Sequence, residues 1–228
     1  SKKLEYGLFM RYSSFITFIN CQRWDYNIFA NLLLFNIELF YMQGFSNELK
    51  QRKINLVANG YDAYCLFTMT GQEKKLANEL NKEYEYLIAT PMLKMAHRSK
   101  NGQKYDVEEL MLSSYVFLYM PNDKKPFEIK SNYYSYKLLS YKNNNGKLMG
   151  SDLEYAKWVL ENEGFLPVSK AKKVDGKVVL VDGPLKEMEG YIIEYSKKNR
   201  NCLVELEFMN QKTKVWVPFE WLDVDLDQ

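Results

Sequence analysis

The C-terminal part of the chain constrains the fold most, because residues 178–222 consist almost entirely of short β-type runs and turns. They read VVLVDGPLKEMEGYIIEYSKKNRNCLVELEFMNQKTKVWVPFEWL. Apolar and polar residues alternate in VELEF and KVWVPF, which gives each strand one face for a core and one for solvent. Several short strands of this kind predict a small SH3-like β-barrel over residues 174–228. Such a barrel is more often a docking module than a catalyst.

Residues 61–120 carry a different pattern, in which strands alternate with one helix. The run Ala63–Met69 is rich in strand-forming residues and predicts a strand. The segment TGQEKKLANELNKEY predicts a helix, with Thr70 as N-cap and Glu73 as its capping-box partner.

The next strand, 87–96, is interrupted early by Pro91. The polar residues 97–104 predict a hairpin loop with Asn101-Gly102 at its tip, which is a strong turn signal. Further strands return before Met120. The order predicts an α+β sandwich in which a helix crosses an antiparallel sheet.

A second helix is predicted over SDLEYAKWVLENEG, with Ser151 as N-cap, Glu154 at the capping-box position and Gly164 past its end. The residues FLPVSKAKK that follow include Pro167, Ser169 and several basic or small residues, and they predict a linker. The predicted organisation is an N-terminal extension of unclear role (1–60), an α+β domain (61–163), a linker (164–173) and the barrel (174–228).

Residues 1–60 show no firm periodicity, although Ser46 is a suitable cap for a helix that begins there. The most apolar stretch, Phe29–Met42, is too short to cross a bilayer and contains Asn and Glu. It also lacks a small-residue cleavage site of the kind that ends a signal peptide. A buried or partner-facing segment is therefore the better interpretation, and we expect no membrane partner.

Composition and motifs exclude several classes of protein. The net charge is +2, so any contact with nucleic acid must come from a local patch. The three cysteines (Cys21, Cys65 and Cys202) are far apart, which argues against a disulfide framework or a zinc site and for a reducing cytoplasm. With a single histidine, no phosphate loop and no GxSxG, we expect no enzyme, no metal and no cofactor.

Three segments now support a resemblance to a known family. GKVVLVDGPLKEMEGYII resembles a KOW motif, with Gly183, Pro184 and Gly190 at its characteristic positions. AYCLFTMTGQEKKLANEL and SSYVFLYM resemble strands of the NusG N-terminal (NGN) domain. The matching positions there are Thr68, Gly71, Glu73, Tyr115, Val116 and Phe117. Together these segments resemble the NusG family over about residues 61–225, as an NGN-like domain followed by a KOW barrel.

The sequence also departs from the family pattern. Ala63 stands where a tryptophan is usual, and Leu112-Ser113 stands where Phe-Pro is usual. The helix that precedes the barrel looks like that of specialised paralogues, most of all the LoaP-type transcription antiterminators. The resemblance thus implies a factor for transcription elongation or antitermination that acts on selected operons.

In this family the NGN domain binds the clamp helices of bacterial RNA polymerase through an apolar sheet surface. Carried over by position, the resemblance implies that the polymerase-binding residues are Tyr64, Phe67, Leu112, Tyr115 and Phe117. Each is also a candidate for the domain core, because alternate residues of a strand must face inward.

The hairpin around Asn101-Gly102 is basic, and the resemblance implies that it contacts nascent RNA or non-template DNA. Its candidate nucleic-acid-binding residues are Lys94, His97, Arg98, Lys100 and Lys104. A cluster of cations at a hairpin tip can neutralise several phosphates, although a solvated tip needs no ligand.

For the barrel, the resemblance implies the ribosome or a termination factor as partner, with Phe208, Met209 and Trp216 as possible contacts or core residues. The alternative function is a KOW-containing RNA-binding or ribosome-associated protein. From Lys172 onward acidic residues slightly outnumber basic ones. This balance favours protein docking over RNA binding.

Overall fold

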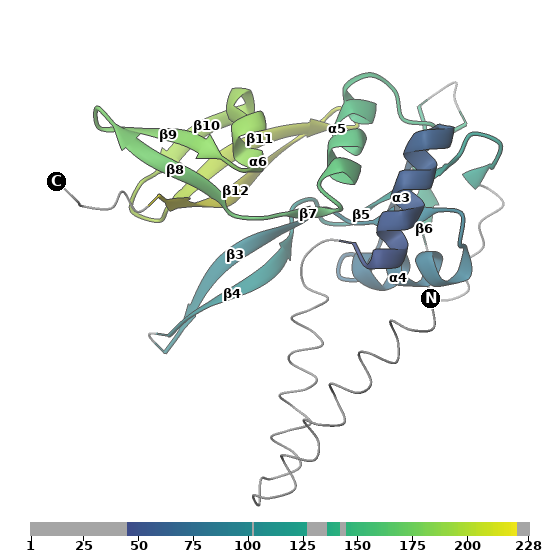
Figure 1. The fold of residues 1–228 in the computed structure, drawn as a ribbon, viewed down its shortest axis with the longest axis horizontal. Helices are drawn as coiled ribbons and strands as arrows, with labels where there is room; N and C mark the ends of the chain where they lie inside the picture. Colours follow the sequence, from purple (N-terminus) through teal and green to yellow (C-terminus); the bar gives the residue numbers. More distant parts are fainter. Residues whose placement is uncertain (1–44, 102, 127–135, 142–144, 223–228) are drawn as a thin grey trace, which may run out of the picture. The chain divides into compact units, whose positions relative to one another are not determined.

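A computed structural model of the chain describes residues 45–101, 103–126, 136–141 and 145–222 (Figure 1). Cys21, the apolar stretch 29–42 and Gly102 of the predicted turn lie outside the described residues. Within the described ranges, no helix has the length and apolarity needed to cross a membrane.

An antiparallel four-stranded sheet forms the centre of the first domain, with the strand order β2-β5-β1-β6. Its strands are β1 (Tyr61–Thr68), β2 (Ile88–Thr90), β5 (Tyr115–Pro121) and β6 (Tyr136–Leu138). β1 confirms the strand expected at 63–69. Cys65 lies opposite Phe117 in the β1–β5 register, so both point to the same face.

The period of two along β1 and β5 divides the sheet into two buried faces. One face carries Tyr64, Leu66 and Leu118, which pack on helix α4 (Glu73–Glu83) through its buried leucines Leu76 and Leu80. The opposite face carries Cys65, Phe117 and Tyr119 and belongs to the larger core.

Helix α4 begins differently from the expected capping box. Its N-cap is Gln72, and the hydroxyl of Thr70 is hydrogen-bonded to that of Ser114 at 2.8 Å. The Glu73 carboxylate is buried and accepts the backbone N–H groups of Gly71 (2.7 Å) and Ser114 (2.6 Å). It therefore ties the start of the helix to the turn before β5.

The β3–β4 hairpin consists of β3 (Leu93–Lys100) and β4 (Gln103–Leu110), and β7 (Phe165–Leu166) pairs with β3 in parallel. The residues expected as a loop, 97–104, are largely the ends of these two strands, and Asn101 has the positive φ (52°) of a tight turn. The three strands form a second small sheet.

Helix α5 (Gly150–Glu161) packs on the sheet face that carries Phe117 and Tyr119, through its buried Ala156 and Val159. The hydroxyl of Tyr119 donates to the carbonyl of Ala156 at 2.6 Å. The N-cap is Met149 rather than the expected Ser151. Gly164 has a φ of +70°, and a Cβ there would come within 2.0 Å of the Thr90 hydroxyl, so this position requires glycine.

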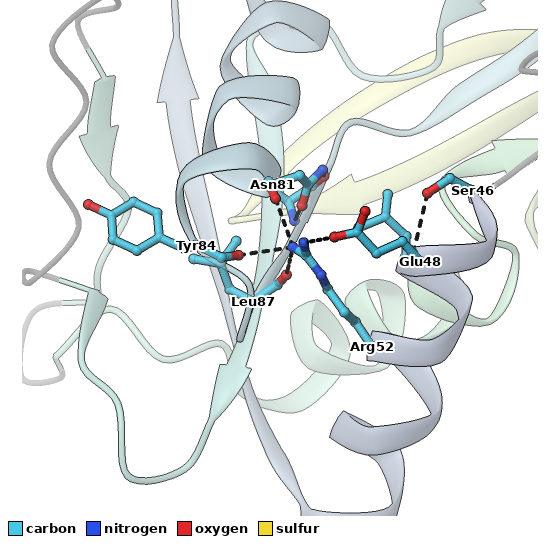
Figure 2. A network of polar contacts seen from close by, with 8 residues as sticks. Ser46, Glu48, Arg52, Asn81, Tyr84 and Leu87 are labelled. Atoms are coloured by element: carbon cyan, nitrogen blue, oxygen red, sulfur yellow. Dashed lines mark hydrogen bonds and ion pairs between the residues drawn. The ribbon is translucent and has the colours of Figure 1, made fainter. Parts of the chain in front are cut away.

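Helix α3 (Asn47–Asn59) lies within the same compact unit as the sheet, which differs from the boundary expected at 60/61. Its predicted cap is confirmed, since the Ser46 hydroxyl accepts the N–H of Leu49. The side chain of Arg52 crosses to the end of α4, where it donates to the carbonyls of Asn81 (2.8 Å) and Tyr84 (2.9 Å) (Figure 2). The same nitrogen also reaches the carbonyl of Leu87 at 3.3 Å.

The second domain is a curved five-stranded sheet with the order β10-β11-β12-β8-β9. Its elements are β8 (Ser169–Val174), β9 (Lys177–Asp182), α6 (Pro184–Glu187), the 3-10 turn η2 (Glu189–Tyr191), β10 (Ile192–Ser196), β11 (Asn201–Phe208) and β12 (Gln211–Trp221). Among the described residues β9 and β10 are its two edges, so the barrel is half closed. The α+β class with a small C-terminal barrel is thus confirmed.

The expected linker, 164–173, lies almost entirely in strands β7 and β8. The small residues Ser169 and Ala171 face inward, whereas Lys170, Lys172 and Lys173 face solvent, so this segment packs after all. Gly183 of the KOW motif has a φ of +89°, and a Cβ there would meet the backbone of Ser169 at 2.8 Å. At Gly190, by contrast, a Cβ would meet nothing within 4 Å.

Candidate functional site

Six aromatic side chains form a continuous line of ring contacts on the sheet face opposite α4. We call this line the aromatic seam; its members are Phe67, Tyr115, Phe117, Tyr155, Trp158 and Phe208. Phe67 and Tyr115 contact edge to face with centroids 5.7 Å apart, and Tyr155 and Trp158 of α5 lie 5.6 Å apart. Edge-to-face pairs at these separations are favourable beyond the area that they bury.

The barrel supplies the central ring of the seam. Phe208, at the end of β11, lies 5.2 Å from Phe117, 5.5 Å from Tyr115 and 5.7 Å from Tyr155 between ring centroids. Phe117 is fully buried, while Phe67 at the end of the seam is 44% exposed. The barrel thus covers part of an aromatic sheet surface and leaves its edge open.

Polar contacts join the barrel to α5 around the seam. The Asp152 carboxylate accepts the backbone N–H of Met209 at 2.9 Å and also the hydroxyl of Tyr141. The indole N–H of Trp158 donates to Glu187 at 3.3 Å. Burial is the main cause that raises the pKa of the Tyr141 hydroxyl to about 12, and its hydrogen bond to Asp152 adds to the shift.

One buried group in the seam has no hydrogen bond. The hydroxyl oxygen of Tyr155 is inaccessible and has no partner among the described residues. A buried hydroxyl without a partner costs free energy of about 1–3 kcal/mol. This hydroxyl therefore offsets part of the stability that the packing of the seam provides.

The predicted polymerase-binding residues divide between the two faces of the sheet. Phe67, Tyr115 and Phe117 lie together in the seam, and Leu112 is buried in the adjoining core. The structure corrects the interpretation of Tyr64, which is buried against α4 on the opposite face and cannot share a surface with the other four. The reason is parity, because Tyr64 and Phe67 are three positions apart on one strand.

Sequence reasoning missed Tyr155 and Trp158 as members of the seam. Both lie in the helix predicted before the barrel, but neither was singled out as a candidate contact. Phe208 and Met209 were named as candidates on the barrel, and both contact the α+β domain. No pattern within the chain indicated that these segments meet.

Three of the predicted nucleic-acid-binding residues on the hairpin have acidic partners. Lys94 donates to Glu109 at 3.0 Å, Arg98 donates to the other oxygen of that carboxylate at 2.6 Å, and His97 lies 2.6 Å from Asp106. Lys100 is exposed, and the side chain of Lys104 lies outside the described residues.

Glu109 holds these cations in place. Burial would raise the pKa of its carboxyl, but the hydrogen bonds from Lys94 and Arg98 outweigh that effect and lower it. The charge that the hairpin presents is therefore smaller than its count of basic residues implies, and Arg98 keeps a side chain that is 58% exposed.

Buried thiols and metal ligands contribute no further site. Cys65 and Cys202 are free and buried, as the strand pattern predicted, and burial raises the pKa of both thiols. In the part of the chain that the structure describes, no group of histidine, cysteine and acidic residues could hold a metal ion.

Neither a protein-family model nor a curated protein sequence matches the chain. Among solved structures, one match is described as domain interaction in Thermotoga maritima NusG. The two share 19% sequence identity with a TM-score of 0.40, and the match covers 70% of this chain and 94% of that chain. A likeness at this level assigns no function, so the residues themselves must support one.

Proposed function

We propose that the protein is a transcription elongation and antitermination factor that binds bacterial RNA polymerase and promotes processive transcription of selected operons. The observation that carries the proposal is the aromatic seam. Its residues Phe67, Tyr115 and Phe117 occupy the positions at which the NusG-like sequence pattern implies contact with the clamp helices.

The chemistry of this surface suits a helical protein partner. Aromatic side chains that lie at the centre of an interface supply much of its binding energy, and tyrosine adds a polar rim to an apolar body. The open end of the seam, at Phe67, gives a partner a first point of contact. The rest of the seam is covered by the barrel, through Phe208 at the end of β11.

Full access to the seam requires the barrel to move away from α5. The contacts that would break include the ring contacts around Phe208 and the hydrogen bonds from Met209 to Asp152 and from Trp158 to Glu187. The hydrogen bond from the Tyr115 hydroxyl to Gln211, at 3.3 Å, would also be lost. The released barrel is then free to contact the ribosome or a termination factor.

Binding of the fluorescently labelled protein to purified core RNA polymerase tests the proposal. Phe67→Ala removes an exposed ring of the seam and is expected to weaken binding by about thirtyfold, the loss of an interface hot spot of about 2 kcal/mol. Tyr191→Ala is the matched control, because Tyr191 is a 58% exposed aromatic residue of the barrel outside the seam. Equal affinities for the two variants would contradict the assignment, and binding to ribosomes alone would favour the alternative of a ribosome-associated protein.

A further inference from the structure

A groove of about 960 Å³ lies between the β3–β4 hairpin and the barrel. The first wall comes from β3 and β4, together with Phe67 and Tyr115, and the second wall comes from β12 and the turn before β11. The barrel wall has no role in the proposed contact with polymerase, nor was it part of the predicted basic hairpin.

Each wall presents an aromatic ring to the groove. Trp216 lies on the outer face of β12, opposite Leu203, and is 40% exposed. Phe67 on the other wall is exposed to a similar extent. A large apolar ring that stays partly exposed beside a polar groove is available to stack on a flat ligand.

The groove is also positively charged. Its charged lining residues are the cations Lys94, Arg98 and Lys214 and one carboxylate, Glu109, with His97 beside them. Arg98 and Lys214 lie on opposite walls, and both side chains are 58% exposed. Glu205, which faces Lys214 across the strand pair, is 3.9 Å from it and closer, at 3.1 Å, to Lys212.

Amide groups complete the barrel wall. Asn199, Asn201, Gln211 and Thr213 line the groove with hydrogen-bonding side chains. The side-chain oxygen of Asn201 is buried and has no hydrogen-bond partner among the residues that the structure describes. That oxygen is enclosed by the protein, so it is not a contact for a ligand in the groove.

We propose that this groove binds a single strand of RNA or DNA. Bases stack on Trp216 and Phe67, and phosphates lie near Arg98 and Lys214. Aromatic platforms within a cationic groove are the usual means by which proteins bind single strands. An acidic peptide would use the cations alone, whereas flat bases use the two rings as well.

The groove extends the proposed role of the basic hairpin in binding nucleic acid. Strand binding in the groove does not require RNA polymerase, so it can be refuted without refuting the proposed binding to polymerase, and the reverse. Both walls must be in place for the groove to exist. A strand in the groove therefore favours the arrangement in which the barrel covers the seam, and by linkage a partner that displaces the barrel weakens strand binding.

The test is fluorescence anisotropy of the full chain with labelled oligo(U) RNA, oligo(dT) DNA and a duplex, each of about 12 nucleotides or base pairs, within the range of single-strand site sizes. We expect both single strands to bind and the duplex to bind more weakly. Trp216→Ala should weaken single-strand binding about tenfold, as loss of one stacked base predicts. Lys214→Gln should lower the slope of log K against log salt by about 0.7, the value for one phosphate of a single strand.

Tyr191→Ala again serves as the control, because it removes an exposed aromatic ring of the barrel outside the groove. Circular dichroism of each variant establishes that the barrel is folded. Unchanged affinity of folded Trp216→Ala for both oligonucleotides would overturn the proposal, as would equal binding of the duplex. Tighter binding of a labelled oligoglutamate peptide, weakened in Lys214→Gln and unchanged in Trp216→Ala, would assign the groove to acidic peptides instead.

Discussion

Replacement of Arg52 by alanine is expected to destabilise the folded protein substantially, although Arg52 lies in a segment whose sequence shows no firm pattern. Its guanidinium makes two short hydrogen bonds, to the carbonyls of Asn81 and Tyr84 at the end of α4. A hydrogen bond from a charged donor contributes about 1.5–3 kcal/mol, and a cation at a helix C-terminus is favourable in addition. Two such bonds, reduced because water can reach these partly buried carbonyls, give an expected loss of about 2–3 kcal/mol.

Equilibrium unfolding in urea, followed by circular dichroism, measures this loss. The control is Glu48→Gln, which removes the carboxylate that pairs with Arg52 on the exposed side of α3. An exposed ion pair contributes about 0–1 kcal/mol, so the control should stay close to the parent protein. If Arg52→Ala lowers the free energy of unfolding no more than the control does, the hydrogen bonds from Arg52 do not stabilise the packing of α3 on α4, and the reasoning is refuted.

Three further predictions concern local groups. Because the folded protein lowers the pKa of Glu109, its contribution to stability is present at neutral pH and is lost as pH falls below about 4. The urea midpoint of Glu109→Gln should therefore change less over that range than the parent's, and an identical pH profile would contradict the ion-pair network. In a Cys21→Ser background, Cys65 and Cys202 should react with iodoacetamide only after denaturation. The reason is that burial raises the pKa of both thiols, that of Cys202 to about 12. Rapid labelling of the native protein would contradict this prediction. Ser46→Ala should cost about 1 kcal/mol in urea unfolding through loss of the N-cap of α3, and no change would mean that the cap is dispensable.

Local sequence patterns predicted the strands well, because whether a segment forms a strand depends mainly on the residues within that segment. Strand-forming residues located β1, alternation located β11 and β12, and Gly183 marked a position where the backbone needs a positive φ. The same rule would also have separated Tyr64 from Phe67, since residues three apart on a strand point to opposite faces. The positions of Tyr64 and Phe67 in the sequence were therefore enough to place them on opposite faces of the sheet.

The charge of the hairpin was also accessible from the sequence. A turn at Asn101-Gly102 fixes the register, which places Lys94 opposite Glu109 and His97 opposite Asp106. Pairing of these charges follows from their position across the strands. The number of basic residues alone overestimates the charge of the hairpin, because acidic residues of β4 lie opposite them.

Other features could not be read from local patterns, because they depend on contacts between distant segments. The acceptors of Arg52 are backbone carbonyls, which carry no sequence signal. The aromatic seam joins β1, β5, α5 and the barrel, and nothing in Tyr155 or Phe208 indicates that the two rings meet. The strand β8 escaped notice because its inward residues, Ser169 and Ala171, are small.

Single-round transcription by purified bacterial RNA polymerase, across a pause and an intrinsic terminator, tests the central claim most directly. The template should carry the leader of the operon next to the gene for this protein. The account predicts that the protein increases read-through, that Phe67→Ala and Tyr115→Ala lose much of this effect, and that Tyr191→Ala retains it. Unchanged read-through with folded protein, or full activity of both seam variants, would contradict it.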